Sequence, residues 1–245
     1  MRPSIICHMA TSIDGRLHPS RFTTAAHGNS AKVLAGHYEA IGERFGSDGW
    51  IVGRKTMTEL AKGSSHAIAS APIPTREPHI GNRMDRNLAI AIDPSGRVHY
   101  GADNIGGDHV VAVLGEQVSD TYLGELREDG VSYLFAGNRG DNLGSALERL
   151  ADLFSVKTLL LEGGGMINGA FLHHRLIDEF STLIHPAVDG VAGSPSIIDY
   201  IGPAGERPGA GQALRLISCE ILEGGMVWLR HAVEDAPGAL ASQSA

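Results

Sequence analysis

The sequence predicts an α/β protein with a mostly parallel central sheet and an antiparallel hairpin at the C-terminal edge. Short apolar runs, typical of buried parallel strands, alternate with helical patterns along most of the chain. One run, at residues 159–161, leads directly into three glycines and then into an apolar helix. Near the end, runs at 213–222 and 226–232 are joined by Glu223-Gly224-Gly225, a pattern typical of a hairpin. Helices are therefore expected on both faces of the sheet.

Composition and charge narrow the class of protein. The 245 residues carry a formal net charge of −8, which argues against a general binder of nucleic acid or of acidic membranes. No apolar run is long enough to span a membrane and no signal-peptide layout is present, so a cytoplasmic location is expected. We expect one domain over residues 1–232 and a disordered tail over 233–245. Cys7 and Cys219 lie in apolar runs and are expected to be buried free thiols.

Hydrophobic periodicity and turn signals predict the remaining elements. Strands are expected at 4–10, 49–53, 88–92, 109–114, 131–136, 159–161 and 176–184. Helices are expected after a cap at Asn29 or Ser30, from Arg54, over 119–129, after a cap at Asn142, and after the three glycines. The first of these helices has the expected core face Val33, Leu34, His37, Ile41 and Phe45, and the helix after Asn142 has Leu143, Ala146, Leu147, Leu150 and Phe154. Long loops are expected at 18–28 and 63–86.

The glycine turn after residues 159–161 is the first candidate site. Glu162 ends the strand, and Gly163-Gly164-Gly165 then precede Met166-Ile167-Asn168 at the start of the helix. Bare backbone lets N–H groups approach an anion closely, and the helix N-terminus adds a favourable dipole. A dinucleotide pyrophosphate would suit this turn, and the alternative is a tight turn without a ligand.

A second candidate site is basic. The strand at 49–53 ends in Gly53 and runs into Arg54, Lys55 and Thr56 at the start of a helix. Cations at a helix N-terminus oppose the helix dipole, which favours an anionic partner over a simple solvated helix end.

A third polar group follows the first strand. Thr11-Ser12-Ile13-Asp14-Gly15-Arg16 carries an Asp-Gly turn signal and short polar side chains at the carboxyl end of a buried strand. Ligands of open α/β sheets bind at that edge, so Ser12 and Asp14 are candidate site residues.

These motifs stand in a recognisable order. The segment 11–16, Val52-Gly53-Arg54-Lys55-Thr56 and Leu161-Glu162-Gly163-Gly164-Gly165 are followed by Leu176-Ile177-Asp178-Glu179 and by Pro186 and Gly190. Over residues 4–232 the set resembles the dihydrofolate-reductase-like superfamily, and most of all the reductase domain of riboflavin biosynthesis. The resemblance implies a dihydrofolate-reductase-like three-layer fold, a homodimer, and NADPH-dependent reduction of a ribosylaminopyrimidine phosphate. No zinc-deaminase signature is present, so a deaminase step would belong to another chain.

The resemblance also implies roles for single residues. Gly53, Arg54, Lys55 and Thr56 would hold the adenosine end of the cofactor, with Arg54 at the 2′-phosphate. The residues implied at the pyrophosphate are Gly163, Gly164, Gly165, Met166, Ile167 and Asn168. Thr11 would lie beside the nicotinamide, and Ser12, Asp14 and Glu162 would face the substrate.

Asp14 and Glu162 are the candidate catalytic residues. They would orient the substrate, and either could donate a proton if burial raised its pKa. The alternatives are a plain turn residue for Asp14 and a helix-terminus carboxylate for Glu162. His8 is interpreted as a hydrogen-bonded core histidine, and the other histidines are too scattered in sequence to suggest a metal cluster.

Other functions stay open at this point. Where the resembled family has a segment that grips the substrate phosphate, this chain has Leu60-Ala61-Lys62-Gly63 and a Pro-rich loop. A reductase of folate or another pterin on the same scaffold is the alternative enzyme, because both substrates present a planar pyrimidine ring. A nucleotide-binding sensor without turnover is the alternative outside enzymes. A homodimer is expected through the C-terminal half, because the apolar run from Phe180 to Val188 would otherwise be exposed at a sheet edge.

Overall fold

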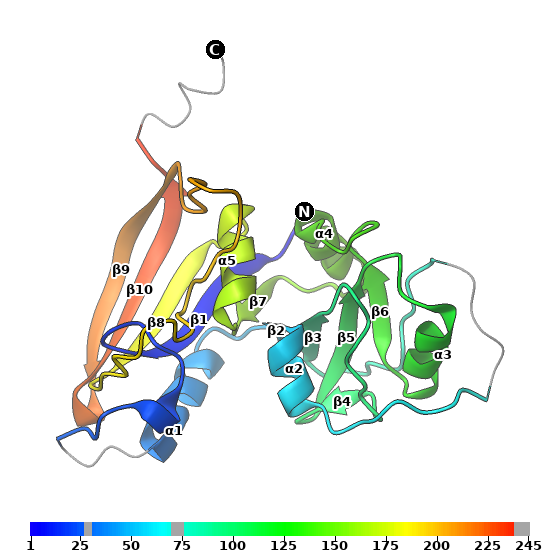
Figure 1. The fold of residues 1–245 in the computed structure, drawn as a ribbon, viewed down its shortest axis with the longest axis horizontal. Helices are drawn as coiled ribbons and strands as arrows, with labels where there is room; N and C mark the ends of the chain where they lie inside the picture. The colour runs from blue at the N-terminus through cyan, green and yellow to red at the C-terminus, as the bar shows by residue number, and fades with distance from the viewer. Residues whose placement is uncertain (27–30, 70–75, 238–245) are drawn as a thin grey trace. The chain divides into compact units, whose positions relative to one another are not determined.

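The computed structural model describes residues 1–26, 31–69 and 76–237 (Figure 1). They form two compact units. The inserted unit contains residues 47–159 together with residues 1–3, and the outer unit contains residues 4–46 and those from 160 onward. The α/β class, with mostly parallel strands and an antiparallel C-terminal hairpin, is confirmed. That residues 1–232 form one domain stays a prediction.

The inserted unit has parallel strands with helices between them. Its elements are β2 (Gly49–Gly53), α2 (Arg54–Leu60), β3 (Leu88–Ile92), β4 (Asn104–Ile105), β5 (Asp108–Leu114), α3 (Asp120–Glu128), β6 (Ser132–Phe135) and α4 (Leu143–Phe154). β3 pairs in parallel with β2 and β5, β6 pairs in parallel with β5, and the short β4 pairs antiparallel with β5. Apolar side chains of α2 and α3 pack on these strands, with Met57, Leu123 and Leu126 all fully buried.

The outer unit begins and ends the chain. Its elements are β1 (Ser4–Ser12), the 3₁₀ turn η1 (Pro19–Arg21), α1 (Ala31–Glu43), α5 (Gly165–His173), β8 (Glu179–His185), β9 (Gln212–Leu222), η2 (Glu223–Gly225) and β10 (Met226–Asp235). β1 pairs in parallel with β8, which pairs antiparallel with β10, and β9 is the outermost strand (Figure 1). The remaining strand, β7 (Thr158–Leu161), is where the chain passes from the inserted unit to the outer unit.

The core of the outer unit surrounds His8. The His8 ring is fully buried, with Nδ1 3.0 Å from Ser181 Oγ and Nε2 3.0 Å from the Tyr38 carbonyl. Trp228 Nε1 also donates to Ser181 Oγ (2.8 Å). Burial lowers the pKa of His8, so the ring is neutral and donates from Nε2 to the carbonyl. The interpretation of His8 as a satisfied core histidine is therefore confirmed.

Both ends of the 47–159 segment meet at Asp48. Its Oδ2 accepts hydrogen bonds from the amides of Lys157 (2.6 Å) and Thr158 (2.9 Å). The Asp48 amide in turn donates to the Thr158 carbonyl (2.9 Å). The segment therefore enters and leaves the inserted unit at neighbouring points.

Several local predictions are confirmed. β2 and β3 have the predicted bounds, and the five predicted core residues of α4 are all buried. Asn142 caps α4, since its Oδ1 accepts from the Ser145 amide (3.2 Å). The hairpin forms as predicted, and β10 continues to Asp235, three residues beyond the predicted end of the domain.

Other predictions are wrong in detail. β8 lies between β1 and β10, so the run from Phe180 to Val188 is not at a sheet edge. Cys219 is exposed, because it lies on the outermost strand β9, whereas Cys7 is buried as predicted. The predicted cap at Asn29 or Ser30 and the end of the tail, residues 238–245, lie outside the described residues. None of the helices in the described ranges is long and apolar enough to cross a membrane.

Candidate functional site

The predicted polar turn forms at the carboxyl end of β1. Ser12 Oγ donates to Asp14 Oδ1 (2.6 Å) and accepts from the Arg16 amide (3.0 Å). Thr11, which is buried, donates from its hydroxyl to the Arg16 carbonyl (3.2 Å). The three short side chains therefore hold one tight turn, because each satisfies a backbone or side-chain group within it.

Asp14 also joins this turn to the loop after β8. Its Oδ1 accepts from the Asp189 amide (3.1 Å) and its Oδ2 from the Gly190 amide (2.8 Å). The Ser12 hydroxyl and then the Gly190 amide lower the pKa of Asp14 to about 2. Asp14 is therefore a carboxylate at neutral pH, and the expectation that it could donate a proton through a raised pKa is wrong.

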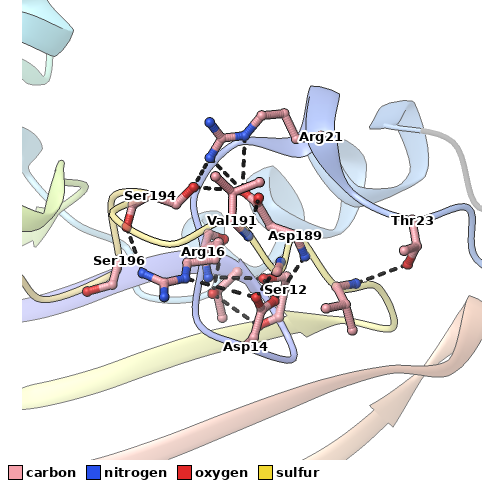
Figure 2. A network of polar contacts seen from close by, with 12 residues as sticks. Ser12, Asp14, Arg16, Arg21, Thr23, Asp189, Val191, Ser194 and Ser196 are labelled. Atoms are coloured by element: carbon pink, nitrogen blue, oxygen red, sulfur yellow. Dashed lines mark hydrogen bonds and ion pairs between the residues drawn. The ribbon is translucent and has the colours of Figure 1, made fainter.

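A second carboxylate, which unlike that of Asp14 is buried, lies beside this turn (Figure 2). The Asp189 side chain is fully buried and accepts two hydrogen bonds at Oδ2 from the Arg21 guanidinium, from Nη2 (2.7 Å) and Nε (3.1 Å). The Ser194 hydroxyl contacts both Arg21 Nη2 and Asp189 Oδ2. Arg21 thus neutralises a carboxylate that would otherwise be costly to bury.

The segment 194–199 connects the polar turn to the glycine turn. Arg16 Nη1 donates to the Ser194 carbonyl (2.6 Å), and the Ile197 amide donates to the Gly15 carbonyl (3.3 Å). At its other end, the Asp199 amide donates to the Gly165 carbonyl (3.0 Å). Two motifs that are far apart in sequence therefore meet within the outer unit, through a segment for which no role was predicted.

The three glycines of the second motif have different surroundings. Gly163 has φ +94°, and a Cβ there would lie 2.9 Å from Met9 Cε. A Cβ on Gly165 would lie 2.3 Å from the Ser196 carbonyl oxygen and 2.7 Å from Asp199 Oδ2. A Cβ on Gly164 would have no atom within 4 Å. Gly163 and Gly165 are thus required by backbone conformation and packing, whereas Gly164 leaves an open approach to the backbone.

Gly164 is also the N-cap of α5. The amides of Ile167 and Asn168 donate to the Gly164 carbonyl, so the unpaired N–H groups of the first turn are those before them, at Gly165 and Met166. Within the described residues neither of these two amides has an acceptor. An anion that approached over Gly164 would meet both N–H groups and the positive end of the helix dipole.

The side chains at the start of α5 differ in accessibility. Met166 is half exposed, and Ile167 is partly buried. Asn168 is fully buried, and its Nδ2 donates to the Ile197 carbonyl (2.8 Å) while its Oδ1 has no partner among the described residues. In this structure the Asn168 side chain therefore holds the segment 194–199 against α5.

Glu162 faces Tyr38 of α1. Burial, followed by the charge and hydrogen bond of Glu162, raises the pKa of Tyr38. The Tyr38 hydroxyl is also 2.9 Å from the His8 carbonyl, which is the alternative acceptor for its single proton. Glu162 is thus a half-buried carboxylate with a neighbouring hydroxyl, and it is more than a helix-terminus charge.

A cavity of about 160 Å³ lies in the outer unit near the polar turn. Phe22, Thr24, Leu34 and His185 are among its lining residues. His185 follows Ile184 at the end of β8 and is opposite Ser12 in the sheet. The imidazole is 5% exposed and its Nδ1 has no partner among the described residues, and burial lowers the pKa of His185. A neutral imidazole with a free nitrogen is suited to hydrogen-bond a polar ligand. In the sequence, only its position before Pro186 marks this histidine.

The predicted basic turn is in the inserted unit. Gly53 is the N-cap of α2, and Arg54 and Lys55 occupy its first turn with exposed side chains. Among the described residues neither cation has a hydrogen-bond or ion-pair partner. Thr56 is partly buried. The two cations are therefore accessible to an anionic ligand.

Comparison with known proteins gives a family and a fold. The sequence model of the RibD C-terminal domain matches residues 3–228, and no curated protein matches the chain in sequence. Among solved structures, Acinetobacter baumannii RibD has 19% identity and a TM-score of 0.60, with 95% of this chain and 58% of that one covered. Riboflavin Biosynthesis Reductase Rib7 from Saccharomyces cerevisiae has 16% identity and a TM-score of 0.54, with 95% and 90% covered.

A third solved structure is of a protein named for its enzymatic activities. It is a Thermotoga maritima diaminohydroxyphosphoribosylaminopyrimidine deaminase/5-amino-6-(5-phosphoribosylamino)uracil reductase, with 15% identity, a TM-score of 0.57, and 94% of this chain and 56% of that one covered. The chain thus spans under two thirds of the length of the Acinetobacter baumannii and Thermotoga maritima proteins. At these identities the likeness shows the fold, which is the dihydrofolate-reductase-like fold predicted above.

Proposed function

The chain belongs to the RibD C-terminal domain family, and we propose that it is an NADPH-dependent reductase of a ribosylaminopyrimidine phosphate. The observation that carries the proposal is the family match over residues 3–228. The activities named for the Thermotoga maritima and Saccharomyces cerevisiae proteins, which share the fold, agree with it. The reduction would belong to riboflavin biosynthesis.

The glycine turn fits the pyrophosphate of such a cofactor. Its open side at Gly164 and the unpaired amides of Gly165 and Met166 are the features that an anion requires. Gly163, Ile167 and Asn168 support this backbone from within, and Thr11 would line the nicotinamide end. When bound, NADPH supplies the hydride, and the protein contributes binding, orientation and exclusion of water.

The basic turn fits the adenosine end. Arg54 would bind the 2′-phosphate, because a guanidinium forms paired hydrogen bonds to phosphate oxygens. Lys55 would add charge, and Gly53 and Thr56 would place the backbone and a hydroxyl beside the ribose. This assignment rests on the resemblance and on the absence of a competing partner for either cation among the described residues.

The substrate would bind at the polar turn. Ser12 and Asp14 would orient it, with Asp14 acting as a permanent carboxylate that accepts hydrogen bonds from amino or hydroxyl groups. Glu162, which already shares a hydrogen bond with Tyr38, is the remaining candidate for moving a proton. His185 would offer its free nitrogen to the edge of the pyrimidine ring in the adjoining cavity.

The homodimer and the cytoplasmic location remain part of this proposal. Because β8 is an inner strand, the dimer contact is better placed on the outermost strand β9. There Leu214, Leu216 and Ile221 are more than half exposed. Sedimentation should show a dimer that Leu214→Glu converts to a monomer, and a wild-type monomer would remove the dimer from the proposal.

Cofactor titration tests the assignment of Arg54. Arg54→Ala should weaken NADPH binding about 10- to 150-fold, the loss expected for a charged hydrogen-bond pair, and leave NADH binding nearly unchanged. Arg139→Ala is the matched control, because the Arg139 side chain is 85% exposed and its contact with Asp141 is long (4.0 Å). An equal loss for both cofactors would refute the 2′-phosphate role.

Turnover separates the alternative functions. The chain should oxidise NADPH with the ribosylaminopyrimidine phosphate and leave dihydrofolate unreduced. Reduction of dihydrofolate alone would make it a pterin reductase, and tight NADPH binding without turnover of either substrate would favour a sensor.

A further inference from the structure

A cluster of histidine and carboxylate side chains lies in the inserted unit, apart from every residue assigned above. Glu125 on α3 and Asp129 at its C-cap are four residues apart, so both carboxylates lie on one face of the helix. His66 comes from the segment 61–69, and one ligand atom from each of these three residues lies within 4.8 Å of the other two. His99 contacts the same cluster through Glu125. The expectation that the histidines form no metal cluster is based on their spacing in sequence, which does not reveal this grouping of one histidine with two carboxylates.

The two carboxylates are unusually placed for acidic side chains. The side chains of Glu125 and Asp129 are only 4% and 7% exposed. Among the described residues neither has an Arg or Lys partner, and their ion-pair contacts are with His99 and His66. Buried carboxylates are normally paired with cations or coordinate metals, so this pair requires a positive charge between or beside them.

The hydrogen bonds of the cluster leave one oxygen of each carboxylate for a ligand. Glu125 Oε1 is held by His99 Nδ1 (2.5 Å), and Asp129 Oδ2 by the Gly101 amide (2.9 Å). The other oxygens face weaker or exchangeable partners, since Ser65 Oγ is 3.5 Å from Glu125 Oε2 and His66 Nε2 is 3.0 Å from Asp129 Oδ1. Outer hydrogen bonds of this kind orient the ligands of metal sites.

We propose that His66, Glu125 and Asp129 bind a divalent transition-metal ion such as Zn²⁺, with His99 as the positioning residue for Glu125. Imidazole and carboxylate donors suit zinc, and three protein ligands leave one coordination position for water. Ligand atoms around tetrahedral zinc are about 3.3 Å apart, from bonds of about 2.0–2.1 Å. His66 Nε2 and Asp129 Oδ1 are 3.0 Å apart, and the three ligand atoms, which lie within 4.8 Å of one another, would adjust to that spacing around the ion. The ion would attach the segment 61–69 to the C-terminal end of α3.

Metal titration of the full chain tests the site without any use of its activity. After removal of metal with a chelator, Zn²⁺ should bind with a stoichiometry of one ion per chain, and Co²⁺ should give the visible absorption of a four- or five-coordinate ion. His66→Gln should abolish this binding. The His66→Gln variant should also fold normally, because the His66 side chain is 37% exposed. His99→Gln should weaken binding by about 10- to 100-fold, as expected for loss of an outer partner.

Two matched variants control for general surface binding. Glu128→Gln is on the same helix and retains an acceptor for the Ala69 amide (2.7 Å), and His174→Gln removes an exposed histidine elsewhere. Both should bind Zn²⁺ as the wild type does. Absence of saturable binding, or binding that survives His66→Gln, would overturn the proposal.

Discussion

Gly164, the N-cap of α5, and Gly165, its first residue, should respond differently to substitution by alanine. Gly165→Ala places a methyl group 2.3 Å from the Ser196 carbonyl oxygen, about 1 Å closer than ordinary van der Waals contact, which begins near 3.4 Å. The clashing atom is backbone, so it cannot rotate away, and the segment 194–199 has to move. Gly164→Ala meets no atom within 4 Å and has φ −61°, which any residue adopts.

The magnitudes follow from these contacts. Overpacking of this kind costs about 1–3 kcal/mol, and alanine gains little helix propensity at the first position of a helix. A protein of this size loses about 2–4 °C of melting temperature per kcal/mol, so Gly165→Ala should melt about 2–12 °C lower. Gly164→Ala should stay within about 0.5 kcal/mol of the wild type. Its methyl group should nevertheless block the anion and weaken NADPH binding about tenfold or more.

Thermal unfolding and cofactor titration of both variants make the comparison. The packing argument fails if Gly165→Ala melts with the wild type, or if Gly164→Ala loses as much stability. The cofactor assignment fails separately, if Gly164→Ala is stable and binds NADPH with unchanged affinity.

Three further substitutions test the polar contacts of Asp189 and Asp14 and the packing of α4. Asp189→Asn should cost about 1–2 kcal/mol, because it takes the charged partner from Arg21, and urea unfolding with no change would disprove that pairing. The pKa of Asp14 is about 2 when folded and 3.8 in its ordinary range, so its carboxylate stabilises the fold above about pH 4 and loses that effect as the pH falls toward 2. Melting temperatures of Asp14→Asn should accordingly vary less than those of the wild type across that interval, and parallel curves would contradict the assignment. Leu150→Ala, at a fully buried position of α4, should cost about 2–5 kcal/mol in the same urea assay, and a loss below 1 kcal/mol would show that α4 does not pack as described.

The elements that sequence predicts well are those specified locally. α4 has a cap at Asn142 and a helical repeat of apolar residues, and both signals lie within a dozen positions of each other. The strand β3 is apolar at every position, and turn residues bound it. No distant contact is needed to place either element.

The errors concern properties that depend on distant parts of the chain. Whether β8 is an inner or an outer strand is decided by β10, which follows it by more than forty residues. The exposure of Cys219 has the same origin, since an apolar run is expected to be buried until its strand is found to be outermost. Strand order is a tertiary property that periodicity does not contain.

Sequence motifs indicate single residues of the candidate site, but they do not indicate the distant residues that contact them. The Asp-Gly turn signal predicts a role for Asp14, but the pKa of Asp14 is lowered partly by the amide of Gly190, 176 positions away. The segment 194–199 has no periodicity or motif, and it acts mainly through backbone groups. His66 and Asp129 are 63 positions apart, which is why spacing rules for metal ligands do not detect them.

The contacts of Asp48 bear on how the length of the segment that follows it can change. Because its carboxylate binds the amides of Lys157 and Thr158, everything between these positions departs from and returns to one place. Insertions or deletions in the loops of this segment leave its two ends together, so long as that closing contact is kept. Changes of length in these loops are therefore expected to be tolerated better than substitutions at Asp48, which remove the contact that joins the two ends.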